Sequence, residues 1–259
     1  MPKAAFAQLF DSQYVDFVED LPFWRYIASR AGDAILEVGC GSGRVLLDLA
    51  GAGYDMTGVD VDGEMLTILQ ANRPPDLPGK IQLHKADLRL LKLNQRFSAI
   101  LIPCNLFSYF GDEDALEALQ AIHRHLLPDG VLAMDLPNTP IILRDKHQDD
   151  AVLDTFTERS LGLPVQVSAR QRIRADRRRV DVEWNYDILH ADGKVERVTA
   201  ARSYHMRTPA DIHQLLHKSA LHLEAVYGGY QRQIYTSSSP RMLVTAVPHG
   251  SQGKEKRMA

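Results

Sequence analysis

Residues 35–44 read ILEVGCGSGR, a short apolar run followed by three glycines at alternate positions. The apolar run predicts a buried strand. The glycines Gly39, Gly41 and Gly43 predict a tight turn into a helix, because glycine tolerates left-handed backbone angles and lets a ligand approach the main chain. A dinucleotide fingerprint would need its third glycine where Arg44 stands, and the Gly-Lys-Ser/Thr of a P-loop is absent. The turn therefore does not match a pyrophosphate cradle.

Strands and helices alternate on both sides of this turn. The first 30 residues carry a helical stripe of apolar side chains and a second short helix that ends at Gly32. Further strands are expected over residues 55–60, 80–87, 97–104 and 131–136, with helices between most of them and a turn at 126–130. Such alternation predicts βαβ units, and therefore an α/β fold with a doubly wound, Rossmann-like sheet covered by helices on both faces.

The pattern changes after Pro140. Apolar and polar side chains alternate over residues 180–188, VDVEWNYDI, which predicts an antiparallel strand with one wet face. The arginine-rich run before it resembles an RNA-binding patch. A turn near residues 176–177 would instead place Arg172 opposite Asp181 and Arg170 opposite Glu183, and opposite charges across a hairpin neutralise such a patch.

These patterns divide the chain into four parts. We expect an N-terminal helical cap (residues 1–32), a Rossmann-like domain (33–150 and 208–248), an inserted antiparallel β-layer (151–207) and a disordered tail (249–259). The inserted layer is expected to lie over the working edge of the larger sheet.

Two aspartates follow successive strands of the expected sheet. Asp60 ends the second strand about 20 residues after the first glycine, where a carboxylate can accept hydrogen bonds from a ribose diol. Asp87 follows the third strand, where a carboxylate can accept from an exocyclic amine. Taken singly, Asp60 or Asp62 could cap the next helix, and Asp87 could be a solvated loop residue. Ligands of open α/β sheets bind at the carboxyl edge, so the three signals in order are stronger together.

As a set, these motifs resemble the class I S-adenosylmethionine-dependent methyltransferase superfamily. Its four successive motifs are matched by ILEVGCGSGR, TGVDVDGEML, HKADLRLL and FSAILIPCNLFSYF. The resemblance covers roughly residues 10–137 and implies a seven-stranded, mostly parallel sheet of order 3-2-1-4-5-7-6. The inserted β-layer and the segment VYGGY resemble a subgroup of small-molecule methyltransferases that includes enzymes that dimethylate sugar amines.

The resemblance implies S-adenosylmethionine as cofactor, S-adenosylhomocysteine as product, and a set of contacts. The expected contacts are Gly39, Gly41 and Gly43 with the methionine part, Glu37 with its amino group, Asp60 with the ribose, Val61 and Met65 with the adenine, Asp87 and Leu88 with the adenine edge, and Asn105 and Leu106 below the sulfonium. Tyr14 is similar to a residue of the segment that closes over the cofactor in this subgroup, although it equally fits a packed helix stripe.

The methyl acceptor is a small molecule in this interpretation. The family's Asn-Pro-Pro motif for amino or base targets is absent after the fourth strand, which counts against methylation of DNA or RNA. Expected pocket residues are Tyr109, His205, Arg207, Tyr227 and Tyr230. Tyr109 and His205 are the catalytic candidates, and His205 would serve as a base for a hydroxyl acceptor, whereas a neutral amine would need little base. The acceptor atom, N or O, stays open.

Composition agrees with a cytoplasmic protein. The formal net charge is −3 among 259 residues, without the basic surplus of a nucleic-acid or membrane binder. Neither a signal peptide nor a transmembrane run is evident, and the two cysteines, Cys40 and Cys104, are too few for a secreted disulfide framework. We expect no metal and a monomer or homodimer. A nicotinamide-dependent oxidoreductase and a non-catalytic S-adenosylmethionine-binding regulator remain the alternatives.

Overall fold

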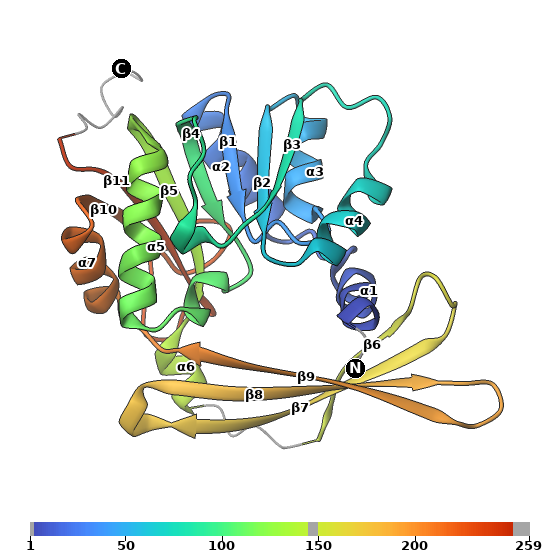
Figure 1. Cartoon of the computed structure of the whole chain (residues 1–259). Helices are drawn as coiled ribbons and strands as arrows, with labels where there is room; N and C mark the ends of the chain where they lie inside the picture. Colours follow the sequence, from blue (N-terminus) through green and yellow to red (C-terminus); the bar gives the residue numbers. More distant parts are fainter. Residues whose placement is uncertain (1–2, 145–149, 251–259) are drawn as a thin grey trace.

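The computed structural model describes residues 3–144 and 150–250, and its largest element is a seven-stranded sheet (Figure 1). The strand order is β10-β11-β5-β4-β1-β2-β3, with parallel pairing throughout except at β11, which runs antiparallel to both β5 and β10. This is the predicted order, with β11 and β10 as the seventh and sixth strands. The seven strands are β1 (Ile35–Val38), β2 (Met56–Asp60), β3 (Ile81–Lys85), β4 (Phe97–Ile102), β5 (Leu126–Pro137), β10 (Leu221–Tyr227) and β11 (Arg241–Pro248).

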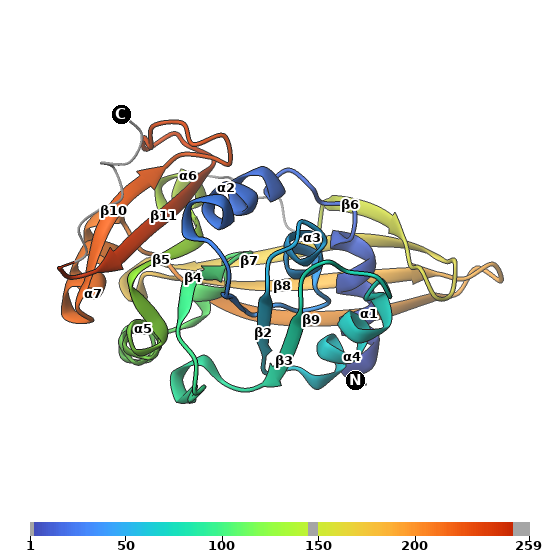
Figure 2. The same ribbon diagram turned by 90° about the horizontal axis from the view of Figure 1, so that it is seen from above.

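Helices cover both faces of this sheet, and each face has its own apolar core. The helices α5 (Asp112–His125) and α7 (Pro209–Lys218) pack on one face, where Phe97, Ile100 and Leu119 are fully or almost fully buried. The helices α2 (Leu21–Ala31), α3 (Arg44–Gly51) and α4 (Gly63–Asn72) pack on the other. Figure 2 shows α2 and α5 on opposite sides of the sheet. As predicted, the first strands and helices of the chain form a doubly wound sheet.

A second, four-stranded antiparallel sheet lies across the edge where β4 ends (Figure 1). Its strands are β6 (Val152–Thr157), β7 (Pro164–Arg174), β8 (Arg179–Leu189) and β9 (Val195–His205). It contacts the rest of the chain through α1 (Lys3–Tyr14) and the short helix η2 (Leu106–Tyr109), which directly follows β4. The four-stranded sheet therefore covers the carboxyl edge of the large sheet.

The register of the β7–β8 hairpin is the one that the sequence predicted. Arg172 lies opposite Asp181 and Arg170 opposite Glu183, with the short helix η3 (Ala175–Arg177) at the turn. Arg170 also forms an ion pair with Asp150. Charges on this face are therefore compensated between neighbouring strands and the segment beside them.

Two local expectations need correction or fall outside the described residues. The turn expected at residues 126–130 is part of β5, because the chain enters the sheet at Leu126 and continues beside β4 after an irregularity in the register. The expected tail lies outside the described residues from position 251 onward. Among the described helices, none is long and apolar enough to cross a membrane.

A buried ion pair fastens the N-terminal helices to the glycine turn. The carboxylate of Asp20 is fully buried and accepts from both terminal nitrogens of Arg44, at 2.5 and 2.7 Å, and from the indole nitrogen of Trp24 at 2.9 Å. Arg44 also donates to the main-chain oxygen of Phe17 at 2.8 Å. Arg44 thus occupies the position of a dinucleotide site's third glycine and links α3 to the segment between α1 and α2.

We expect Arg44→Met to lower the free energy of unfolding by about 3 kcal/mol or more, because it leaves the buried Asp20 charge without a counterion. Urea unfolding at neutral pH measures this loss. Arg25→Met is the matched control: Arg25 pairs with Asp48 at the surface with a side chain that is 56% exposed, and its loss should cost less than about 1 kcal/mol. Equal effects of the two substitutions would contradict a fastening role for Arg44.

Candidate functional site

The glycine turn between β1 and α3 packs against η2 on one side and faces open space on the other. Gly39 and Gly41 both have left-handed backbone angles, with φ of +67° and +52°. A Cβ atom on Gly39 would lie 2.5 Å from Cδ2 of Leu106, whereas one on Gly41 would meet no atom within 4 Å. The main chain of the turn is therefore held by Leu106 and accessible to a ligand at Gly41.

Asp60 is held in place at the end of β2 with hydrogen-bonding capacity to spare. Its Oδ2 accepts from the Gly41 amide and its Oδ1 from the Asp62 amide, both at 2.9 Å. Burial raises the pKa of Asp60 above its usual value, although these amide bonds oppose the rise. Asp62, not Asp60, caps α4, since its side chain accepts from the Glu64 amide. The second lone pairs of the Asp60 oxygens are suited to a pair of ribose hydroxyls.

Glu37 is a buried carboxylate with an unused oxygen. It is 3% exposed, and its Oε2 finds no hydrogen-bond partner among the described residues. Burial raises the pKa of Glu37 well above its usual value, and the nearby Arg44 opposes the rise only in part. A buried carboxylate in this state is stabilised by an incoming cation, and the ammonium group of an amino acid supplies one.

The residues expected around an adenine lie in different surroundings. Val61 is exposed beside Asp60, and Met65 is buried on α4. Asp87 precedes the short helix η1 (Leu88–Leu90), and its carboxylate is engaged by the amide and the guanidinium of Arg89, which lowers its pKa. The Leu88 side chain lies in the core. Asp87 therefore already has a cationic partner, and its adenine contact stays a prediction.

After β4 the chain turns sharply at Cys104 and Asn105. Both residues have left-handed backbone angles, with φ of 56° and 59°. Cys104 is a free, solvent-accessible thiol in a recess, where burial raises its pKa to about 11. Cys40, the other free thiol, is buried beside the glycine turn. Asn105 and Leu106 thus lie at the carboxyl end of β4 beside Gly39.

Aromatic side chains contact one another between this turn and the four-stranded sheet. The phenol oxygens of Tyr109 and Tyr204 are 3.5 Å apart, and the Tyr204 ring lies 5.8 Å from that of Trp184. Burial raises the pKa of Tyr14 to about 12, and the nearby Cys104 thiol and Tyr109 phenol add to the rise. We call Tyr14, Tyr109, Trp184 and Tyr204 the aromatic cluster. It joins α1, η2, β8 and β9.

The sequence identified only Tyr14 and Tyr109 of this cluster. Trp184 was correctly placed on the buried face of its strand, but that face was not assigned to the pocket. Tyr204 is one residue before the expected His205, and successive side chains of a strand point to opposite faces. The aromatic residue, and not the histidine, therefore faces Tyr109.

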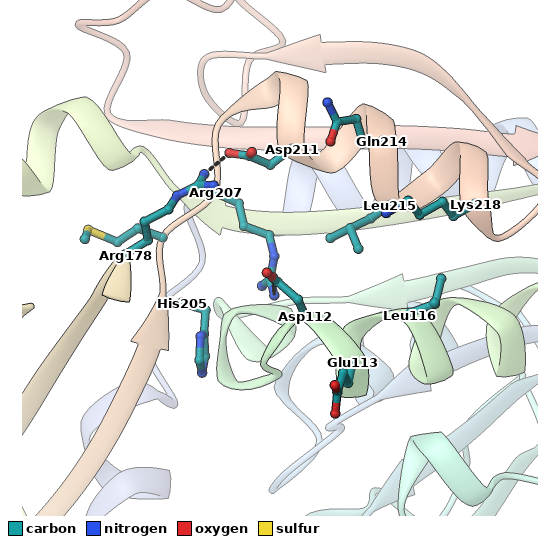
Figure 3. A pocket seen from close by; sticks show the side chains of 11 residues that line it. Asp112, Glu113, Leu116, Arg178, His205, Arg207, Asp211, Gln214, Leu215 and Lys218 are labelled. Atoms are coloured by element: carbon teal, nitrogen blue, oxygen red, sulfur yellow. Dashed lines mark hydrogen bonds and ion pairs between the residues drawn. The ribbon is translucent and has the colours of Figure 1, made fainter. Parts of the chain in front are cut away.

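His205 and Arg207 line a different cavity, of about 380 Å³, between α5 and α7 (Figure 3). Arg207 is 5% exposed and donates to the main-chain oxygen of Phe110 at 2.8 Å and to Asp112 at 3.0 Å. Burial and the neighbouring Arg207 lower the pKa of His205. Arg207 thus stabilises the C-terminal end of η2 through the main chain of Phe110. The base role of His205 stays a prediction.

The two tyrosines of VYGGY separate in space. Tyr227 packs on Phe23 of α2, with ring centroids 6.2 Å apart. Tyr230 donates a hydrogen bond to the buried Asp135 at 3.0 Å. Arg241 also donates to Asp135, and it donates to Asn105 at 2.8 Å. Tyr230 therefore joins the turn after β4 through Asp135 and Arg241, a pair that the sequence did not reveal.

Comparison with known proteins identifies the domain. Residues 35–130 match the family model of a methyltransferase domain. The chain is 27% identical to the cypemycin N-terminal methyltransferase of a Streptomyces species over 82% of each protein. It is 30% identical to the dTDP-3-amino-3,6-dideoxy-alpha-D-glucopyranose N,N-dimethyltransferase of Streptomyces fradiae, over 39% of this chain and 38% of that protein. An S-adenosylmethionine-dependent methyltransferase of Clostridium acetobutylicum superposes with a TM-score of 0.78 at 17% identity, covering 95% of this chain and 98% of that one.

Residues 35–130 thus match a methyltransferase domain, and the whole chain has the fold of an S-adenosylmethionine-dependent methyltransferase. Its alignments with the first three curated relatives cover 54%, 38% and 42% of those proteins, which is about half their length or less. S-Adenosylmethionine, which is named as the cofactor of similar structures, fits the residues present: the unpaired Glu37 oxygen suits its ammonium group, and the spare lone pairs of Asp60 suit its ribose.

We expect Glu37→Gln to have opposite effects on stability and on cofactor binding. The pKa of Glu37 is raised in the folded state, so the wild type loses stability as pH rises above the unfolded value of about 4.3. The variant should gain about 1 kcal/mol at pH 7 and nothing at pH 4. It should bind S-adenosylhomocysteine about tenfold more weakly, because it loses the charge that faces the ammonium.

Thermal unfolding at the two pH values and calorimetric titration measure these effects. Glu117→Gln, on the exposed side of α5, is the matched control and should change neither quantity. Wild-type affinity in Glu37→Gln would remove Glu37 from the cofactor site.

Proposed function

We propose that this protein transfers the methyl group of S-adenosylmethionine to an amine of a small-molecule acceptor. The observation that carries the proposal is the pairing of two features at one sheet edge. Glu37 and Asp60 form the polar side of a cofactor site, and the turn at Cys104 and Asn105 opens toward the aromatic cluster. A methyl group held over this turn would face the cluster.

An amine acceptor is favoured over a hydroxyl because of the protonation state of the cluster. Burial raises the pKa of Tyr14, Tyr109 and Cys104, so these groups are protonated at neutral pH. Asp154 is a carboxylate near Tyr14, and its charge raises the pKa of Tyr14. Its Oδ2 is already engaged, because it accepts a hydrogen bond from Gln13 at 2.9 Å. A hydroxyl needs a base as it attacks, whereas a neutral amine carries its own lone pair and can release a proton after transfer.

The residues of the chain have binding and orienting roles in this mechanism. When bound, S-adenosylmethionine would supply a methyl group activated by its sulfonium for in-line displacement, with S-adenosylhomocysteine as the leaving group. Glu37 would hold its ammonium group and Asp60 its ribose, and Asn105 and Leu106 would lie beneath its sulfonium. Tyr109 and Tyr204 would exchange hydrogen bonds with the acceptor, so alignment of the two reactants would provide much of the acceleration.

Two relatives support nitrogen as the acceptor atom. One is described as an N-terminal methyltransferase of cypemycin and the other as an N,N-dimethyltransferase of an amino sugar nucleotide. The second name specifies nitrogen, and the first specifies an N-terminus. We propose a small-molecule amine and a cytoplasmic location for this protein, without nucleic acid as a partner.

We expect calorimetric titration to give micromolar dissociation constants for S-adenosylmethionine and S-adenosylhomocysteine, and no binding of NAD. Asp60→Ala should weaken both adenosyl ligands by about tenfold or more, because the ribose hydroxyls lose a charged acceptor. Asp33→Ala, at the opposite end of β1, is the control and should bind as the wild type does. Binding of NAD alone would favour an oxidoreductase, and binding without turnover on any amine would favour a regulatory protein.

The pH dependence of methylation separates an amine mechanism from base catalysis. With an amine acceptor identified by screening, kcat/KM should rise with pH until the acceptor's own pKa and then level off, since only the neutral amine attacks. His205→Gln should leave this profile and kcat within about threefold of wild type. A loss of about a hundredfold in kcat, with the ascending limb of the profile removed, would establish His205 as the base instead.

A further inference from the structure

The turn after β4 carries two strained residues in succession. The left-handed region is unfavourable for non-glycine residues, more so for cysteine than for asparagine, and Cys104 and Asn105 both adopt it. Such strain persists only where the surrounding structure enforces it, and it concentrates at functional sites. Asn105 precedes η2, but its side chain makes no capping bond there. The stabilising contacts must therefore come from elsewhere.

Arg241 supplies one of these contacts. At the start of β11, its Nη2 donates to the Asn105 Oδ1 at 2.8 Å and to the Asp135 Oδ2 at 2.8 Å, while its Nε donates to the Asp135 Oδ1 at 2.7 Å. Asp135, on β5, is 1% exposed and also accepts from Tyr230. Because Asp135 holds one edge of the guanidinium with both of its oxygens, Arg241 presents a rigid donor to Asn105.

Arg44 supplies a weaker contact from the opposite side. Its Nη2 lies 3.6 Å from the Cys104 Sγ, and the buried Asp20 holds its guanidinium. Each residue of the strained pair is thus contacted by an arginine that is anchored to a buried aspartate. The two arginine–aspartate pairs come from different parts of the chain. Asp20 and Arg44 belong to its N-terminal part, whereas Asp135 and Arg241 lie on β5 and β11.

The position of this turn affects both halves of the site. Leu106 follows Asn105 and occupies the space beside Gly39, and Tyr109 ends the same short helix and faces Tyr204. A shift at Asn105 would therefore move the surface beneath the cofactor and the wall of the acceptor space together.

We propose that Arg241 is a positioning residue, which enforces the left-handed conformation of Asn105 through its side-chain oxygen and thereby sets the placement of η2. This inference rests on the proposed function for its effect on cofactor and acceptor. Arg241 itself acts through Asn105 and needs no contact with either ligand.

A double-mutant cycle tests this role. Arg241→Lys keeps a positive charge for Asp135 but cannot bond two partners in the same plane, so we expect about tenfold weaker S-adenosylhomocysteine binding. Asn105→Ala should cost a similar factor, and Asn105→Gly less, because glycine adopts left-handed angles without support. In the Asn105→Gly background, Arg241→Lys should add less than about a twofold loss.

Hydrogen exchange gives a readout that does not need the cofactor. The amides of Leu106 and Ser108 donate to the main-chain oxygens of Pro103 and Asn105 at 3.3 and 2.9 Å. Their exchange should accelerate in Arg241→Lys and Asn105→Ala while the core of the sheet keeps its protection. Arg30→Lys is the matched control, because Arg30 pairs with Glu224 at a similar side-chain exposure, 32% against 27% for Arg241.

The outcomes separate this inference from the proposed function. Unchanged exchange in Arg241→Lys, or an undiminished effect of Arg241→Lys in the Asn105→Gly background, would overturn the positioning role. Failure of the wild type to bind S-adenosylhomocysteine would instead overturn the proposed function, and the exchange data would still decide the role of Arg241. With an acceptor in hand, Arg241→Lys should lower kcat more than it raises the acceptor KM.

Discussion

The carboxyl edge of the large sheet is governed by the cost of burying carboxylates. Glu37, Asp20 and Asp135 are each 3% exposed or less, and removing such a charge from water costs several kcal/mol unless a counterion and hydrogen bonds replace the solvent. Arg44 compensates Asp20 and Arg241 compensates Asp135, with two donor atoms each. Glu37 keeps an oxygen without a partner among the described residues. Asp20 and Asp135 therefore have counterions, whereas Glu37 is open to an incoming cation.

The ion pair between Arg44 and Asp20 also distinguishes the glycine turn from a dinucleotide fingerprint. A dinucleotide needs a small residue at the third fingerprint position so that the helix can pack closely and the pyrophosphate can approach its N-terminus. Here that position holds Arg44, whose guanidinium is committed to Asp20 and to the Phe17 carbonyl. The arginine at the place of the third glycine therefore also fastens the N-terminal helices to α3, and the unpaired oxygen of Glu37 stays open to a cation.

Local patterns predicted the elements and the β7–β8 register, because turn position and alternating side chains determine pairing without long-range information. The strand order came from the resemblance, since no local pattern encodes which strands become neighbours. Tyr204 and His205 could not be told apart from the segment RSYHMRT, where apolar alternation is too weak to show which face is inward. Arg241 was missed because its partners, Asp135 and Asn105, are more than a hundred residues away in the chain.

In the proposed site, the large sheet and the four-stranded sheet have different roles, and this difference affects specificity for the acceptor. The proposed cofactor contacts lie mainly at the ends of β1, β2 and β4, whereas the aromatic cluster comes from α1, η2 and the four-stranded sheet. The elements α1 and η2 contribute to both groups, through Tyr14 and through Leu106 and Tyr109. Substitutions on β8 and β9 can therefore reshape the acceptor space without touching Glu37 or Asp60.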